Sequence, residues 1–115
     1  MLEIEGEEYR VTYDPDAATL AFEGTLRLQG MDAYAPIIEL LDQAVEAAHA
    51  VTTLDVRGLE FLNSSGINIL FRFVIKTRDR GVSRLVVRGT TGVFWQTRSL
   101  RNMQRLMPGL ELELA

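Results

Sequence analysis

Apolar and polar residues alternate along the first part of the chain, and this pattern predicts a β-hairpin. Tyr9, Val11 and Tyr13 alternate with charged or hydroxyl-bearing residues, which is the period of a strand with one buried face. The turn sequence Asp-Pro-Asp follows at residues 14–16. A second alternating run then continues to Leu28, and we expect a bulge or bend at Gly24 within it.

Three segments with helical periodicity follow the hairpin. In the first, apolar residues recur three and four positions apart between residues 37 and 48, and we expect Asp32 to cap this helix. The second helix is predicted from about residue 64 to residue 80 and closed by Gly81. The third is predicted over residues 92–107. Short apolar or alternating runs predict the remaining strands, at residues 52–56, 84–88 and 110–114.

The predicted element order is therefore ββαβαβαβ, which indicates a single α/β domain over residues 1–115. Most of the predicted strands alternate instead of being apolar throughout, so one face of the sheet should meet water or a partner. We accordingly expect a mixed β-sheet with its helices mainly on one face.

The composition narrows the classes of function. The chain is 47% hydrophobic and 24% charged, as in ordinary globular domains, and it has no cysteine and a single histidine. These counts exclude disulfides and thiolate chemistry and disfavour a multi-histidine metal site. No nucleophile–base pair or phosphate-binding glycine-rich loop is present, so we expect no enzyme activity, no metal and no cofactor. The acidic N-terminus and the lack of a membrane-length apolar stretch predict a cytoplasmic protein without membrane insertion.

Charge is distributed unevenly along the chain. Residues 72–105 contain nine basic residues and one acid, whereas the rest contains three basic residues and fifteen acids. The basic side chains are either solvated faces beside an acidic half or a surface that binds an acidic protein, a nucleotide or a nucleic acid. The net charge of −4 argues against direct nucleic-acid binding, so we favour the first interpretation and leave an acidic protein partner open.

The sequence Asn63-Ser64-Ser65-Gly66 opens the second predicted helix. The first turn of a helix has backbone N–H groups without an intrahelical partner, and a side-chain oxygen there can accept a hydrogen bond as an N-cap. The same geometry stabilises a phosphate group. Chemistry alone leaves both roles open for these residues.

Residues 55–67 (Asp-Val-Arg-Gly-Leu-Glu-Phe-Leu-Asn-Ser-Ser-Gly-Ile) resemble the central segment of STAS domains, the family of bacterial anti-sigma factor antagonists. That family shows a short strand, an apolar pair, and then Asp-Ser-Ser/Thr-Gly at the start of a helix. The chain length, element order and mid-chain position also match, and residues 95–106 resemble a bacterial subgroup of STAS-like regulators. Gly66 matches the family glycine, whereas Asn63 stands where the family usually has aspartate.

The resemblance implies a regulatory module in signal transduction and transcription regulation that acts by partner switching. In the family, a serine or threonine of this motif is phosphorylated by an anti-sigma factor that is also a serine kinase of the histidine-kinase-like ATPase type. A PP2C-type phosphatase reverses the modification. By position, the phosphoacceptor is Ser64, with Ser65 as the second candidate.

The second predicted helix also carries a candidate partner surface. One apolar arc contains Ile67, Leu70, Phe71, Val74 and Ile75. Ile69 and Phe73 lie outside this arc. They either pack against a neighbouring helix or join Asn63 and Gly66 in a partner-binding patch beside the phosphoacceptor. If they form the patch, Phe73→Ser should abolish partner capture without unfolding the chain.

Two other functions remain open from the sequence. The chain could be a constitutive STAS accessory subunit of a transporter complex, bound to an ATPase without a phosphorylation cycle. Alternatively, it could be an anion- or nucleotide-binding module that uses Arg98 and Arg101.

Overall fold

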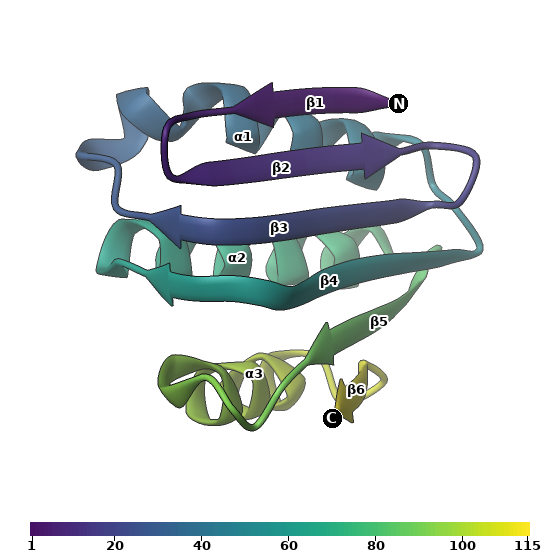
Figure 1. Cartoon of the computed structure of the whole chain (residues 1–115). Coiled ribbons are helices and arrows are strands. Elements are labelled where there is room, and N and C mark those ends of the chain that lie inside the picture. Colours follow the sequence, from purple (N-terminus) through teal and green to yellow (C-terminus); the bar gives the residue numbers. More distant parts are fainter.

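The computed structural model describes all 115 residues, which form a six-stranded mixed sheet and three helices (Figure 1). The helices are α1 (Gly30–Glu46), α2 (Ser64–Arg80) and α3 (Phe94–Leu106). The strands are β1 (Leu2–Glu5), β2 (Tyr9–Asp14), β3 (Thr19–Leu26), β4 (Val51–Leu62), β5 (Arg84–Gly89) and β6 (Glu111–Leu114). The predicted α/β class is confirmed, and the predicted ββαβαβαβ order corresponds to the elements from β2 onward.

Strand β1 is the element that the sequence pattern did not predict. It is four residues long and pairs antiparallel with β2, with Leu2 opposite Tyr13. Only Ile4 of this strand is even half-buried. A run this short, with one inward apolar side chain, is too brief for its period to be recognised.

Helix boundaries follow the predictions with small corrections. Helix α2 has the predicted bounds and ends at Gly81, whose left-handed backbone (φ 70°) closes it. Helix α1 begins earlier than predicted: Gln29 occupies the N-cap position, and Asp32 lies in the first turn instead of capping the helix. Helix α3 begins at Phe94, two residues later than predicted.

The strands lie in the sheet in their sequence order, from β1 to β6. The pairs β1–β2 and β2–β3 are antiparallel, and the pairs from β3 to β6 are parallel. Crossover connections between parallel strands are right-handed, so an order that never reverses places all three helices on the same face. The carboxyl ends of β3, β4 and β5, and hence the starts of α1, α2 and α3, share one edge, at the left in Figure 1. We call it the carboxyl edge.

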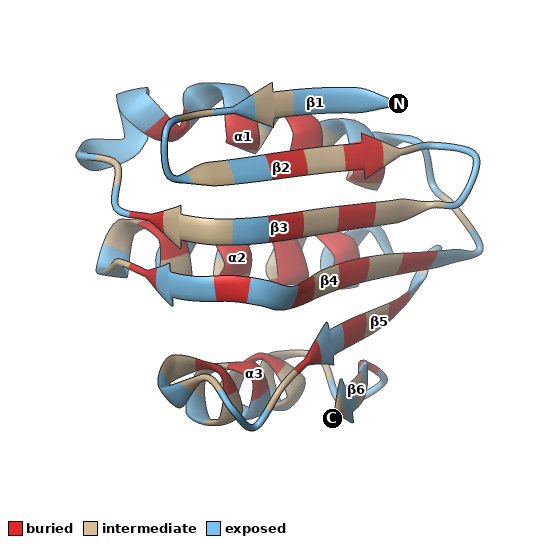
Figure 2. Cartoon of the chain, in the orientation of Figure 1, coloured by how far each residue is buried: buried red, intermediate tan, exposed pale blue.

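The hydrophobic core lies between the helices and one face of the sheet (Figure 2). Inward side chains such as Val11, Phe22, Leu54 and Val87 alternate along their strands with outward residues, most of them polar. On the outward face, ion pairs join neighbouring strands, as between Arg88 of β5 and Glu113 of β6. One face of the sheet is thus not covered by helices, as the alternating strands predicted, and that face is open to water or to a partner.

The bend predicted at Gly24 is confirmed. The pairing of β3 with β4 shifts register between Gly24 and Thr25. Gly24 has a φ of 89°, and a Cβ atom there would collide with the carbonyl oxygen of Glu8. A side chain at this position is therefore excluded both by backbone conformation and by space.

Strand β4 is longer than predicted, and side chains of α3 hydrogen bond to the part of it that β5 does not pair with. Its pairing with β5 ends at Asp55, yet the strand continues to Leu62. Beyond that point, the buried Gln96 donates from Nε2 to the carbonyl oxygens of Val56 (2.6 Å) and Leu59 (3.0 Å). The indole of Trp95 also donates to the Leu59 carbonyl (3.0 Å). Helix α3 thus supplies the donors that β5 no longer provides.

Candidate functional site at the start of helix α2

The motif Asn63-Ser64-Ser65-Gly66, which contains the predicted phosphoacceptors, lies at the carboxyl edge, at the junction of β4 and α2. Strand β4 ends at Leu62, Asn63 is the N-cap of α2, and Ser64 is its first helical residue. The Asn63 N–H also donates to the carbonyl oxygen of Leu26, at the end of β3 (3.1 Å). The cap is therefore attached to two neighbouring strands of the sheet.

The side chain of Asn63 uses both its acceptor and its donor. Oδ1 accepts from the Gly66 N–H (3.0 Å) and from the Tyr34 hydroxyl (2.7 Å). Nδ2 donates to the carbonyl oxygen of Leu28 (2.9 Å), in the segment between β3 and α1. An ionised aspartate could accept the first two bonds but could not donate the third. The structure thereby gives a physical reason for asparagine here: the amide joins α1, α2 and the loop before α1.

Tyr34 and Gly66 complete this cluster. The ring of Tyr34 is buried, and burial raises the pKa of its hydroxyl, which keeps it a neutral donor to Asn63. A Cβ atom on Gly66 would collide with the Leu62 side chain and would lie 2.8 Å from the Tyr34 hydroxyl oxygen. Glycine is therefore needed for the close approach of α1 to the first turn of α2.

The two candidate phosphoacceptors differ in exposure. Ser64 is exposed, whereas Ser65 is half-buried. Both occupy the first turn of α2, where backbone N–H groups lack intrahelical acceptors and the helix dipole is positive. The structure thus brings Asn63, Ser64, Ser65 and Gly66 together at one helix terminus.

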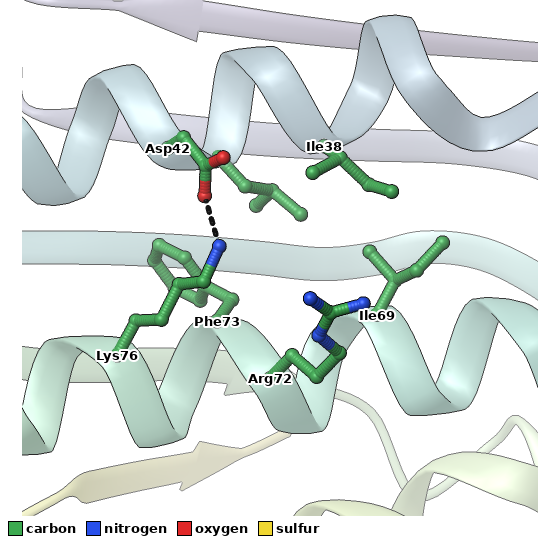
Figure 3. Close-up of a pocket in the computed structure, with 7 residues that line it drawn as sticks. Ile38, Asp42, Ile69, Arg72, Phe73 and Lys76 are labelled. Carbon is green, nitrogen blue, oxygen red and sulfur yellow. Dashed lines mark hydrogen bonds and ion pairs between the residues drawn. The ribbon is translucent and has the colours of Figure 1, made fainter. Parts of the chain in front are cut away.

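Ile69 and Phe73 are not part of an exposed patch. Both side chains are buried, with exposed fractions of 3% and 2%, and they face α1 across the α1–α2 interface (Figure 3). Only a shallow groove remains there, and Lys76 and Asp42 form an ion pair across it (2.8 Å). The expectation of a partner-binding role for Ile69 and Phe73 is therefore corrected in favour of the helix-packing alternative.

The predicted core arc of α2 is also displaced. The buried residues of the helix are Gly66, Ile69, Leu70, Phe73, Val74 and Thr77, while Ile67, Phe71 and Ile75 are only half-buried. Helix α2 has α1 on one side and α3 on the other. Apolar side chains therefore extend around both flanks, and a helical wheel alone could not identify which flank is fully covered.

The large exposed apolar residues near the site are ones that sequence analysis did not identify as partner-binding. Met31 in the first turn of α1 is 40% exposed, Phe61 at the end of β4 is 48% exposed, and Phe94 at the start of α3 is fully exposed. All three lie at the carboxyl edge, on the elements that flank Ser64. The guanidinium of Arg27 lies over the Phe61 ring, 5.8 Å from its centre. Their shared location follows from topology, so no local sequence pattern could have grouped them.

Two further side-chain contacts lie away from the start of α2. The hydroxyl of Tyr13 hydrogen bonds to Nε2 of His49 (2.7 Å), which follows the end of α1 in the sequence. Asp55 accepts two side-chain bonds from Arg57 on the outer sheet face. No group of three or more histidine, cysteine, aspartate or glutamate side chains is gathered as a metal site would require. None of the helices has the length and apolar character needed to cross a membrane.

Comparison with known proteins gives structural matches but no sequence matches. No protein-family model matches the chain, and neither does any curated protein sequence. A chain from the crystal structure of the diguanylate cyclase SiaD in complex with its activator SiaC, from Pseudomonas aeruginosa, matches over 100% of both chains, with a TM-score of 0.75 and 14% identity. Apo-SiaC from the same organism matches over 98% of this chain and 96% of its own, with a TM-score of 0.73 and 14% identity.

A third match is an anti-sigma factor antagonist from Mycobacterium paratuberculosis. It covers 96% of this chain and 82% of its own length, with a TM-score of 0.58 and 16% identity. The chain therefore has a STAS-like α/β fold. Nearly its whole length superimposes on SiaC and, with a lower score, on an anti-sigma factor antagonist.

Proposed function

We propose that this chain is a regulatory protein-interaction module that switches partners and is controlled by phosphorylation of Ser64. The observation that carries this proposal is an exposed serine at the first position of α2, held at the carboxyl edge of a STAS-like fold. Exposure favours Ser64 over the half-buried Ser65 as the acceptor. We further propose that the module is cytoplasmic and is not itself an enzyme.

The mechanism of the switch is electrostatic and local. Unmodified Ser64 opens α2 at the carboxyl edge, where Met31, Phe61 and Phe94 are exposed on α1, β4 and α3, so a partner that covers this edge would bury apolar surface together with a small neutral hydroxyl. Phosphorylation would add a charge of about −1.5 to −2 at the same point. Desolvating that charge against a fitted interface is unfavourable, so the modified form is released. The Asn63 network keeps the first turn of α2 in place in both states.

The proposed partners follow from the resemblance to anti-sigma factor antagonists. They are an anti-sigma factor that is a serine kinase of the histidine-kinase-like ATPase type and a PP2C-type phosphatase. The structural match to SiaC favours a second partner class, because SiaC is described as the activator of a diguanylate cyclase. A cyclase of this kind is therefore the alternative target of the same switch.

Mass spectrometry tests the acceptor directly. We would isolate the chain from its own host, with and without phosphatase treatment, and compare wild type with Ser64→Ala and the matched control Ser65→Ala. We expect a phosphatase-sensitive phosphoryl group on wild type and on Ser65→Ala, and none on Ser64→Ala. A chain that stays unmodified across growth conditions would contradict the switch and favour a constitutive docking subunit.

A further inference from the structure

Four basic side chains in this structure have no ion-pair partner. Eight of the twelve lysine and arginine residues pair with a carboxylate, including five of those in the basic segment 72–105. These ion pairs place a carboxylate beside most of the cations of the basic segment. The unpaired residues are Arg72 of α2 and three residues of α3, namely Arg98, Arg101 and Arg105.

The three arginines of α3 form one line with Phe94, which we call the α3 stripe. The four residues are spaced by four, three and four positions, which keeps them within about 60° of one another around a helix. All four are exposed. The buried residues Gln96, Leu100 and Met103 lie on the opposite side of the helix. The α3 stripe is therefore a continuous outward surface of three cations that begins with an aromatic ring.

The stability of α3 does not explain this arrangement. The helix contains no acidic residue, and like charges three and four positions apart repel one another. Its N-cap, Val93, provides no side-chain hydrogen bond, and its first turn has no acid. Arg105 donates only to the neutral oxygen of Asn102 (3.3 Å). Arg105 lies in the last turn, where a cation is favourable to the helix dipole, but neither the dipole nor an ion pair accounts for Arg98 and Arg101.

The helix is nevertheless held firmly in the molecule. Gln96 bonds to the carbonyl oxygens of Val56 and Leu59 and accepts from the Thr90 N–H (2.8 Å). The indole N–H of the neighbouring Trp95 also donates to the Leu59 carbonyl. These contacts fix the rotation of α3 about its axis, so the stripe has a defined direction toward solvent.

We propose that the α3 stripe is a docking surface for an acidic helical segment of a partner protein. Arg98 and Arg105 are separated along the helix axis by about 10.5 Å, which matches acidic residues spaced i, i+3 and i+7 on a second helix. Phe94 offers an apolar contact at one end. The acidic remainder of the chain would repel an extended polyanion such as a nucleic acid, whereas a short acidic helix meets only the stripe. The proposal does not depend on phosphorylation of Ser64.

A peptide titration tests the docking surface. The probe is a fluorescent helical peptide of about 15 residues with glutamates at i, i+3 and i+7 and a leucine one turn before them. Its control has glutamine in place of each glutamate. We would measure binding to the unphosphorylated full chain by anisotropy, for wild type, Arg101→Glu and the matched variant Arg72→Glu. A circular dichroism melt of each variant accompanies the titration.

We expect Arg101→Glu to weaken binding about tenfold and Arg72→Glu to change it less than about twofold. The affinity of wild type should fall with added salt, and the glutamine peptide should not bind. Arg101→Glu creates opposite-charge pairs with Arg98 and Arg105, so its melting temperature should be at or above that of wild type. Loss of binding therefore cannot be attributed to unfolding.

Several results would overturn the proposal. Equal weakening by Arg72→Glu and Arg101→Glu would show a diffuse charge effect. Tighter binding of a DNA duplex that is lost in Arg101→Glu would assign the stripe to nucleic acid. Self-association of wild type in sedimentation that is lost in Arg101→Glu would assign it to a second copy of the chain. Because the assay uses unmodified protein, none of these results bears on the Ser64 switch.

Discussion

The hydroxyl of Tyr34 donates a 2.7 Å hydrogen bond to Oδ1 of Asn63, which joins the first helix to the cap of the second. The two residues are 29 positions apart in the sequence. The same amide holds the Leu28 carbonyl with its other end, so the loop that precedes α1 is fixed as well. The position of Ser64 is therefore set by contacts from three separate segments and not by its own helix alone.

Replacing Asn63 with aspartate should destabilise the chain at neutral pH by about 1–2 kcal/mol. The carboxylate would face the Leu28 carbonyl without a proton to donate. The gain from a negative charge near the start of α2 offsets only part of this loss. Urea unfolding at pH 7 measures the change, with Asn68→Asp, an exposed position on α2, as control.

The pH dependence of the Asn63→Asp destabilisation distinguishes a lost hydrogen bond to the Leu28 carbonyl from a general loss of packing. The repulsion would raise the pKa of the introduced carboxyl group in the folded state, so the destabilisation should shrink as the pH falls and the group becomes protonated. A protonated carboxyl can donate to Leu28. A deficit that stays constant down to pH 4 would argue against the hydrogen-bond account.

Phe73→Ser should unfold or strongly destabilise the chain, by about 3 kcal/mol or more. Its ring is buried between α2 and α1, and the change leaves both a cavity and a hydroxyl there. The matched variant Phe94→Ser removes a fully exposed ring and should leave the free energy of unfolding nearly unchanged. Equal stability of the two variants, measured by thermal melting, would contradict the assignment of Phe73 to the core.

Ser64→Asp should keep the fold and raise its stability slightly, by about 0.5 kcal/mol. The new charge lies at the positive end of α2 and is exposed to solvent. This result would show that a charge on Ser64 cannot act by melting the helix, so any effect on partners must arise in the interface. Denaturant titrations compare it with Ser64→Ala, and a loss of helical signal in Ser64→Asp would contradict the expectation.

Asp55→Asn should remove a small, pH-dependent contribution to stability. Burial alone would raise the pKa of Asp55, but the hydrogen bonds and charge of Arg57 together hold it below its usual value. A lowered pKa in the folded state means that the contribution is present above the unfolded-state pKa and is lost as the pH falls through the folded one. The difference between wild type and variant, less than about 1 kcal/mol, should therefore be seen at pH 7 and vanish in strong acid.

The sequence predicted the fold class and most element positions because these depend on local periodicity. Gly24 and Gly81 were interpreted correctly, since each is required by a left-handed backbone within a few residues. The core face of α2 was assigned wrongly, because the neighbours that cover Ile69 and Phe73 come from a helix more than 20 residues earlier. The cluster of Tyr34 with Asn63 and the shared edge of Met31, Phe61 and Phe94 depend on strand order, which no local pattern contains.

Shortened forms of this chain that lack α3 would lose the hydrogen bonds that Trp95 and Gln96 donate to the end of β4. A chain that stopped before Phe94 would leave the carbonyl oxygens of Val56 and Leu59 without Gln96 and Trp95. The strand would then present an open hydrogen-bonding edge between buried apolar side chains. Such an edge is a template for strands from other molecules. Losing the last helix would therefore turn an interior strand of the sheet into a site of aggregation.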